Sequence, residues 1–134
     1  MLRKWTDSIG YAIEGVLYAS GTQKHVRLHF SVIIILLIFC FVIGVEKQDF
    51  IIISLIATVV VVAEMLNSAI ETVVDMISPH KSEKARIAKD MAAGAVLISA
   101  VSSCIGAFYL ILPYIRSFYE NGFTIAKHDL IDIA

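Results

Sequence analysis

Three long apolar stretches alternate with short polar segments along this chain. They cover residues 28–45, 50–77 and 91–115. Each stretch is long enough to cross a hydrocarbon layer of about 30 Å as an α-helix. A chain of 134 residues could not cover three such helices on all sides with its own polar residues, which argues against a fully buried soluble core. The pattern therefore predicts an all-α integral membrane protein with three transmembrane helices.

A different pattern precedes the first apolar stretch. Apolar and polar residues recur at helical spacing between about residues 4 and 22, which predicts an amphipathic helix. Its apolar positions are Trp5, Ile9, Ile13, Val16 and Leu17. Such a helix lies on the inner membrane surface or packs against the bundle, and both positions keep it at the interface. Gly21 and Thr22 mark a bend before the first span, and Pro79 ends the second helix.

Composition agrees with a single membrane domain over residues 1–134, including a C-terminal tail over 116–134. Hydrophobic residues make up 58% of the chain, the formal net charge is −1, and the mean hydropathy is +0.81. We expect no nucleic-acid partner.

The distribution of basic residues predicts the orientation in the membrane. They gather before the first span and between the second and third spans, as Arg3, Lys4, Lys24, Arg27, Lys81, Lys84, Arg86 and Lys89. The positive-inside rule then places the N-terminus and the 78–90 loop in the cytoplasm, and the tail 116–134 outside. Arg116 stands mildly against this placement.

The second apolar stretch carries ionisable residues that a membrane helix normally avoids. At about 100° per residue, Glu64, Asn67, Glu71 and Asp75 form one stripe about 80° wide. A carboxylate in hydrocarbon costs at least a few kcal/mol, so these acids indicate function. Glu64 lies about 20 Å along the helix from Ile77, whereas Asp75 is close to the cytoplasmic surface. Carboxylates at this spacing can hold a divalent cation, and a deep glutamate can serve as a general base.

The 78–90 loop that follows the stripe is dense in hydrogen-bond donors. Topology and contacts with anionic lipid headgroups would account for this loop if it stood alone. Phosphoryl transfer also requires acidic residues next to a loop that attracts phosphate, because its catalysis rests on positioning and charge neutralisation. The stripe and the 78–90 loop provide this combination. Neither a Walker A motif nor a Gly-x-Gly-x-x-Gly loop occurs, so a nucleotide would be held by another architecture.

Two other functions are compatible with acids inside a membrane helix. A small oligomeric ion or proton-coupled transporter would use a membrane glutamate, although its key acid usually occupies a two-sided, mid-membrane site. A scaffold would use the acids as polar contacts between helices, but such contacts average under about 1 kcal/mol. The stripe reaches the cytoplasmic edge of the membrane, which favours phosphoryl transfer over a transporter or a scaffold.

Two motifs resemble those of the prokaryotic diacylglycerol kinase and undecaprenol kinase family. The first is Glu64-x-x-Asn67-Ser-Ala-Ile-Glu71-x-x-Val-Asp75, and the second is Ala88-Lys89-Asp90-Met-Ala-Ala-Gly94-Ala-Val-Leu97. The likeness continues upstream through Gly10-Tyr11-Ala12 and Arg27-Leu28-His29, and it covers about residues 4–115.

The resemblance implies a homotrimeric bacterial inner-membrane kinase with active sites shared between subunits. Such an enzyme transfers the γ-phosphate of ATP, with Mg²⁺, to the hydroxyl of a lipid alcohol in phospholipid or lipid-carrier recycling. The sequence does not separate diacylglycerol from undecaprenol as the acceptor, because the lipid-facing residues are generic.

The resemblance also implies roles for individual residues. Glu64 would be the catalytic base, Glu71 a metal ligand, and Asn67 and Asp75 supporting residues. The ATP-binding positions would be Lys4, Tyr11, Gln23, Glu71, His80, Ser82, Lys89 and Asp90.

One position departs from the family pattern. Gln23 stands where the family normally has a second metal-binding glutamate, and His25 occupies a common asparagine position. An amide oxygen can bind Mg²⁺ but adds no charge, so we expect weaker metal affinity. His25 or His29 could compensate, and packing at the membrane surface is the alternative role for both.

Overall fold

The computed structural model describes residues 2–78, 80 and 82–121, apart from the side chains of residues 2–5 and 121. This part of the chain forms four α-helices: α1 (Leu2–Thr22), α2 (Lys24–Val42), α3 (Lys47–Ile77) and α4 (Glu83–Asn121). Helices α2, α3 and α4 are long and apolar enough to cross a membrane. The predicted all-α class, with one N-terminal helix before three candidate membrane spans, is therefore confirmed.

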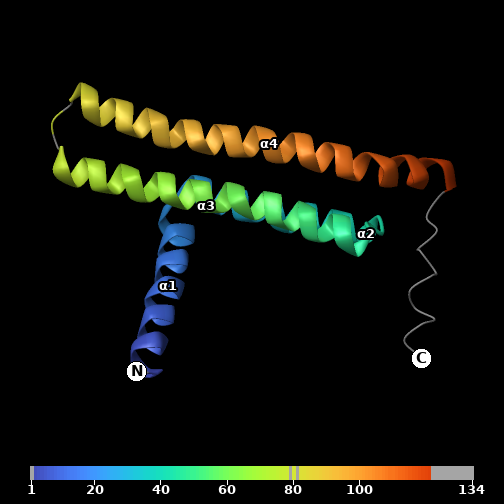
Figure 1. Cartoon of the computed structure of the whole chain (residues 1–134), viewed down its shortest axis with the longest axis horizontal. Helices are drawn as coiled ribbons and strands as arrows, with labels where there is room; N and C mark the ends of the chain where they lie inside the picture. The colour runs from blue at the N-terminus through green and yellow to red at the C-terminus, as the bar shows by residue number, and fades with distance from the viewer. Residues whose placement is uncertain (1, 79, 81, 122–134) are drawn as a thin grey trace.

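The helices are arranged as a long bundle with one helix projecting from it. α3 and α4 run antiparallel beside each other, α2 packs on α3, and α1 extends away crosswise (Figure 1). The apolar residues of α1 remain exposed in this arrangement, with Ile9 at 59%, Ile13 at 54% and Leu17 at 65%. Contact of α1 with the membrane surface stays a prediction.

The break between α1 and α2 falls one residue after the predicted bend. Gln23 adopts an extended backbone with ψ 113°, and its side chain makes no capping hydrogen bond. Arg27 Nη1 donates to the carbonyl of Gly21 across the break at 3.2 Å. This contact joins the end of α1 to the first turn of α2.

The turn between α2 and α3 is set by Gly44, which has φ +72°. The amide of Val45 donates to the carbonyl of Cys40 at 3.0 Å, and the amide of Gly44 donates to that of Phe41 at 3.2 Å. These two bonds form a Schellman motif, which ends a helix at a left-handed residue. Glycine adopts this conformation without the steric cost that a side chain would add.

The helices extend beyond several of the apolar stretches. α2 and α3 begin before residues 28 and 50, and α4 runs from Glu83 to Asn121 rather than from 91 to 115. The tail predicted from residue 116 therefore begins inside a helix, and residues 122–134 lie outside the described residues, as does Pro79. Hydropathy marks where apolar side chains stop, whereas backbone hydrogen bonds and caps decide where a helix ends.

The apolar core lies at the end of the bundle that contains the α2–α3 turn. We call this the apolar end, and define it by Cys40, Ile53 and Ile111, which are 0%, 0% and 7% exposed. Tyr114 on α4 donates its hydroxyl to Asp49 Oδ2 on α3 at 2.6 Å. These contacts fix α2 and α4 against the first half of α3.

Farther along, α3 and α4 approach each other closely. Ser103 donates its hydroxyl to the carbonyl of Ile56 at 2.8 Å. A Cβ added at Gly106 would lie 3.1 Å from Ile56 Cδ1, which is tighter than an ordinary contact. The small residue at this point lets the first half of α3 pack closely against the second half of α4.

Candidate active site

The predicted stripe lies on the second half of α3, and burial decreases along it. Glu64 is 6% exposed and Asn67 is 8% exposed. Glu71, nearly two turns after Glu64, is half-buried, and the Asp75 carboxylate is mostly exposed. The stripe therefore leads from a buried carboxylate to the surface. We call this region, together with the first two turns of α4, the polar end.

Asn67 contacts the next acid of the stripe. Its Nδ2 donates to Glu71 Oε1 at 3.3 Å. Its Oδ1 is buried and has no hydrogen-bonding partner among the described residues. A buried oxygen without a donor costs about 1–3 kcal/mol, so an unmatched amide at this point indicates a binding or catalytic function. The geometry brings an amide oxygen and a carboxylate to the same part of α3.

The surface end of the stripe is joined to α4 by an ion pair. Lys89 Nζ contacts Asp75 Oδ1 at 2.5 Å, and the Lys89 side chain is 34% exposed. This contact places one of the predicted nucleotide ligands beside the acidic row. Asp90, the next residue, bonds instead to Arg86 on its own helix.

Arg86 was not singled out from the sequence. Its Nη2 contacts Glu83 Oε1 at 2.6 Å and its Nη1 contacts Asp90 Oδ2 at 2.6 Å. The charge-assisted bond from Arg86 lowers the pKa of the Glu83 carboxyl from its ordinary value. The spacings i,i+3 and i,i+4 on a helix were the sequence signal for both contacts.

The other predicted site residues do not meet the stripe. Tyr11 on α1 is 72% exposed, and Gln23 is half-buried at the α1–α2 break. Across the described part of the chain, no hydrogen bond or ion pair joins either residue to Glu64 or Glu71. The side chain of Lys4 lies outside the described residues.

His80 and Ser82 lie in the connection between α3 and α4. Ser78 donates its hydroxyl to the carbonyl of His80 at 3.0 Å, and the His80 side chain is exposed. Ser82 Oγ accepts the amide of Ala85 at 3.1 Å, which makes Ser82 the N-cap of α4. Ser82 thus has a structural contact in addition to its predicted place near the nucleotide.

The polar end offers carboxylate and amide oxygens, which are the kind of ligand that Mg²⁺ prefers. Within the described residues, these oxygens do not surround a metal ion on all sides. No group of three His, Cys, Asp or Glu side chains capable of holding a metal occurs within the described residues. Mg²⁺ commonly keeps several waters and is held by one or two carboxylates together with substrate phosphates. The Glu71 carboxylate and the free Asn67 amide oxygen fit that mode of binding.

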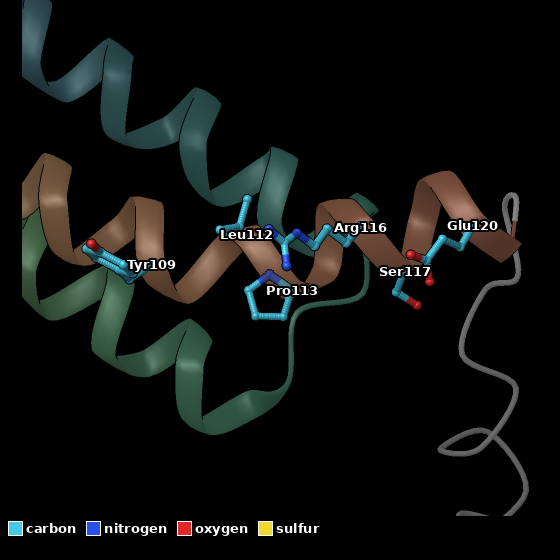
Figure 2. A pocket seen from close by; sticks show the side chains of 6 residues that line it. All are labelled: Tyr109, Leu112, Pro113, Arg116, Ser117 and Glu120. Carbon is cyan, nitrogen blue, oxygen red and sulfur yellow. The ribbon is translucent and has the colours of Figure 1, made fainter.

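Two hollows lie elsewhere on the molecule. An apolar groove of about 540 Å³ runs between α2 and α4 over α3, with Ala57 and Val60 among its lining residues. A hollow of about 370 Å³ follows one face of α4 alone, from Tyr109 past Arg116 to Glu120 (Figure 2). This second hollow is near the apolar end and includes none of the predicted site residues.

Comparison with known proteins places these features in a family. The model for prokaryotic diacylglycerol kinase matches residues 10–112, which include the whole stripe and the ion pairs of Arg86 and Lys89 at the polar end. The chain belongs to the prokaryotic diacylglycerol kinase family. Every predicted site residue except Lys4 lies inside the matched region. The family predicted from the two motifs is therefore confirmed.

Curated relatives carry two different kinase names. A diacylglycerol kinase of Synechocystis sp. is 36% identical over 111 residues, or 82% of this chain, which spans 63% of that relative. An undecaprenol kinase of Bacillus subtilis is 33% identical over 112 residues, covering 84% of this chain and 91% of that protein. A diacylglycerol kinase of Haemophilus influenzae is 31% identical over 93 residues, covering 69% of this chain and 79% of that protein. The family and these names agree with the predicted kinase class, and neither supports the transporter alternative.

Proposed function

We propose that this chain is a lipid kinase that transfers the γ-phosphate of ATP to the hydroxyl of a membrane lipid alcohol. The observation that carries this proposal is the stripe on α3, which leads from the buried Glu64 to an ion pair with Lys89 on α4. The names of the curated relatives support diacylglycerol or undecaprenol as the acceptor.

The residues of the polar end divide the chemistry between them. Glu64 accepts the proton of the lipid hydroxyl, and the freed oxygen attacks the γ-phosphorus while ADP leaves. Lys89 neutralises negative charge on the phosphates, and Asp75 orients the Lys89 ammonium before the nucleotide binds. Asn67 holds the Glu71 carboxylate through its Nδ2.

Glu71 and Asn67 would hold Mg²⁺ at this site through oxygen atoms. When bound, the ion would supply charge neutralisation at the β- and γ-phosphates. Gln23 is the third proposed ligand, and it lies at the α1–α2 break rather than beside Glu71 in one chain. With an amide in place of a carboxylate, the site should bind Mg²⁺ less tightly.

The incomplete site in one chain supports a homotrimer in which neighbouring protomers share active sites. Tyr11 and Gln23 belong to the α1 side of the molecule, while Glu64 and Glu71 belong to α3. Exposed apolar residues on all three long helices, such as Ile35 at 67%, Leu55 at 62% and Leu97 at 65%, leave surface for both lipid and neighbouring protomers. A partner's α1 would bring the nucleotide contacts to the stripe.

We place the protein in the bacterial inner membrane with the polar end on the cytoplasmic side. The basic residues in α1, in the first turn of α2 and at the start of α4 support this orientation. It would give the nucleotide access from the cytoplasm, and it leaves the segment after residue 115 on the outer side.

A phosphotransfer assay tests the proposed function. Purified protein in mixed micelles is given radiolabelled ATP and Mg²⁺, with diacylglycerol, with undecaprenol, or with no acceptor. We expect labelled phospholipid or labelled undecaprenyl phosphate only when the matching acceptor is present. Absence of labelled lipid from both acceptors at saturating Mg²⁺ would contradict the proposal.

A further inference from the structure

Arg86 uses all three nitrogens of its guanidinium in contacts on the first two turns of α4. Its Nε and Nη2 donate to the two carboxylate oxygens of Glu83 at 3.2 and 2.6 Å, which makes that contact bidentate. Its Nη1 donates to Asp90 Oδ2 at 2.6 Å. The side chains of Arg86, Glu83 and Asp90 are 61%, 70% and 62% exposed. We call these three residues the arginine clamp.

A contribution to the stability of the protein does not explain the contacts of the arginine clamp. Exposed ion pairs contribute little to the free energy of unfolding, because water screens the charges and two long side chains lose freedom. A bidentate contact between guanidinium and carboxylate instead fixes direction, because the planar fork matches the two oxygens. The clamp therefore determines where the third group, the Asp90 carboxylate, is held.

The clamp lies directly beside the proposed phosphate contact. Lys89 precedes Asp90 in the chain, and its ammonium is bonded to Asp75 on α3. Consecutive helical residues point in directions about 100° apart, so Lys89 faces α3 while Asp90 turns toward Arg86. One helical turn thus presents a cation to the stripe and holds the neighbouring anion in a fixed position.

We propose that Arg86 is a positioning residue for nucleotide binding in this enzyme. Glu83 holds the Arg86 guanidinium, and Arg86 in turn holds the Asp90 carboxylate in the orientation that contacts the nucleotide. This inference rests on the proposed function, because it takes Lys89 and Asp90 as nucleotide contacts. It assigns roles to Arg86 and Glu83, which neither the motifs nor the resemblance had singled out.

Positioning and simple charge attraction predict opposite results for Glu83. ATP is a polyanion, so a nearby negative charge repels it and a nearby positive charge attracts it. If Arg86 acted only through its charge, Glu83→Gln would strengthen nucleotide binding and Arg86→Lys would leave it unchanged. If Arg86 acts by positioning Asp90, both substitutions weaken binding, because both break the bidentate contact.

The experiment measures nucleotide affinity and turnover on the full-length protein in mixed micelles. Displacement of a fluorescent ATP analogue gives the affinity without requiring turnover, and the phosphotransfer assay gives KM for ATP, KM for the lipid and kcat. The variants are Arg86→Ala, Arg86→Lys and Glu83→Gln, with Lys84→Ala as a control that removes one positive charge from the same helical turn.

We expect Arg86→Ala to weaken ATP binding about fivefold, and Arg86→Lys and Glu83→Gln to weaken it about two- to threefold. The KM for the lipid and the thermal transition should remain at their wild-type values, and Lys84→Ala should change ATP affinity less than twofold, by roughly the effect of one screened charge.

Tighter ATP binding by Glu83→Gln, wild-type affinity in Arg86→Lys, or lowered thermal stability without a change in ATP affinity would overturn the inference. Failure of the proposed function would be seen separately, as a wild-type protein that produces no labelled lipid. The displacement measurement still decides the role of Arg86 in that case.

Discussion

The two ends of α3 handle polar groups in different ways. At the apolar end, Asp49 accepts the hydroxyl of Tyr114 at 2.6 Å, beside a core in which Ile53 is fully buried. At the polar end, Glu64 is 6% exposed and the Asn67 Oδ1 has no partner among the described residues. The Asp49 carboxylate at one end has a partner on α4, whereas the other end carries a buried amide oxygen with no hydrogen-bonding partner among the described residues.

This difference indicates that the apolar end of α3 serves to pack the helices, whereas the polar end serves the reaction. Apolar side chains and paired polar groups explain the apolar end, because both favour the folded helices over separated ones. Buried acids in a membrane helix oppose stability, so their presence requires a function. The contrast also indicates which substitutions should change the fold and which should change the reaction.

The largest expected effect is at Glu64. Glu64→Gln keeps the size of the side chain but removes its basicity, so kcat should fall by about 10²–10⁴-fold, the usual contribution of a general base. The phosphotransfer assay measures this loss. Asp49→Asn is the matched control, because it neutralises a carboxylate of the same helix at the apolar end, and it should retain kcat. A kcat for Glu64→Gln within about threefold of wild type would remove Glu64 from the role of base.

Ile53→Ala should lower stability and leave kcat unchanged, the reverse of the pattern expected for Glu64→Gln. Ile53 is 0% exposed, so truncation leaves a cavity and should lower the free energy of unfolding by about 2–5 kcal/mol, measured by denaturant titration in micelles. The kcat of the folded fraction should be unchanged. Ile35→Ala, at a position 67% exposed, is the control and should lower stability by less than about 0.5 kcal/mol. A loss of kcat as large as that of Glu64→Gln would show that the two ends are not separable.

A metal test at Gln23 should give a smaller effect. Gln23→Glu restores a charged oxygen ligand, so the Mg²⁺ concentration for half-maximal activity should fall about fivefold, a change of roughly 1 kcal/mol. Gln48→Glu makes the same chemical change in the first turn of α3 and should leave the Mg²⁺ dependence unaltered. Equal Mg²⁺ dependence in wild type and Gln23→Glu would show that position 23 does not touch the metal.

The smallest effect is expected at the contact between Tyr114 and Asp49. Tyr114→Phe removes the hydroxyl that donates to Asp49, so the free energy of unfolding should fall by about 1 kcal/mol with no change in kcat. A change at another aromatic residue, such as Phe118→Tyr, would not test this contact. Among the described residues, only Tyr114 donates a cross-helix hydrogen bond to Asp49. An unchanged unfolding midpoint would mean that the apolar core alone holds α4 to the start of α3.

Local sequence patterns predicted much of the fold and part of the site. Apolar runs located the three candidate spans, and helical periodicity placed Glu64 and Asn67 on one face, where both are buried. Helix ends were predicted less well, because Gly44 acts through backbone hydrogen bonds and Ser82 through a side-chain cap, and hydropathy registers neither.

Contacts between helices could not be predicted from the sequence. Tyr114 meets Asp49 across 65 positions, and Lys89 meets Asp75 across 14, and both contacts depend on how α3 and α4 are aligned. Hydropathy gives the length of each helix but not its alignment with a neighbour. The Arg86 contacts differ, because their i,i+3 and i,i+4 spacing on one helix could have been read from the sequence, although they were not predicted.

A single assay that compares one substitution from each end of α3 tests most directly whether the buried end of the stripe carries out the reaction. The rate of phosphate transfer from ATP to the lipid acceptor, per folded molecule and below every thermal transition, is measured for wild type, Glu64→Gln and Ile53→Ala. We expect Ile53→Ala to transfer phosphate at the wild-type rate and Glu64→Gln to transfer almost none. Transfer by Glu64→Gln at the wild-type rate would contradict the claim that the buried end of the stripe carries out the chemistry.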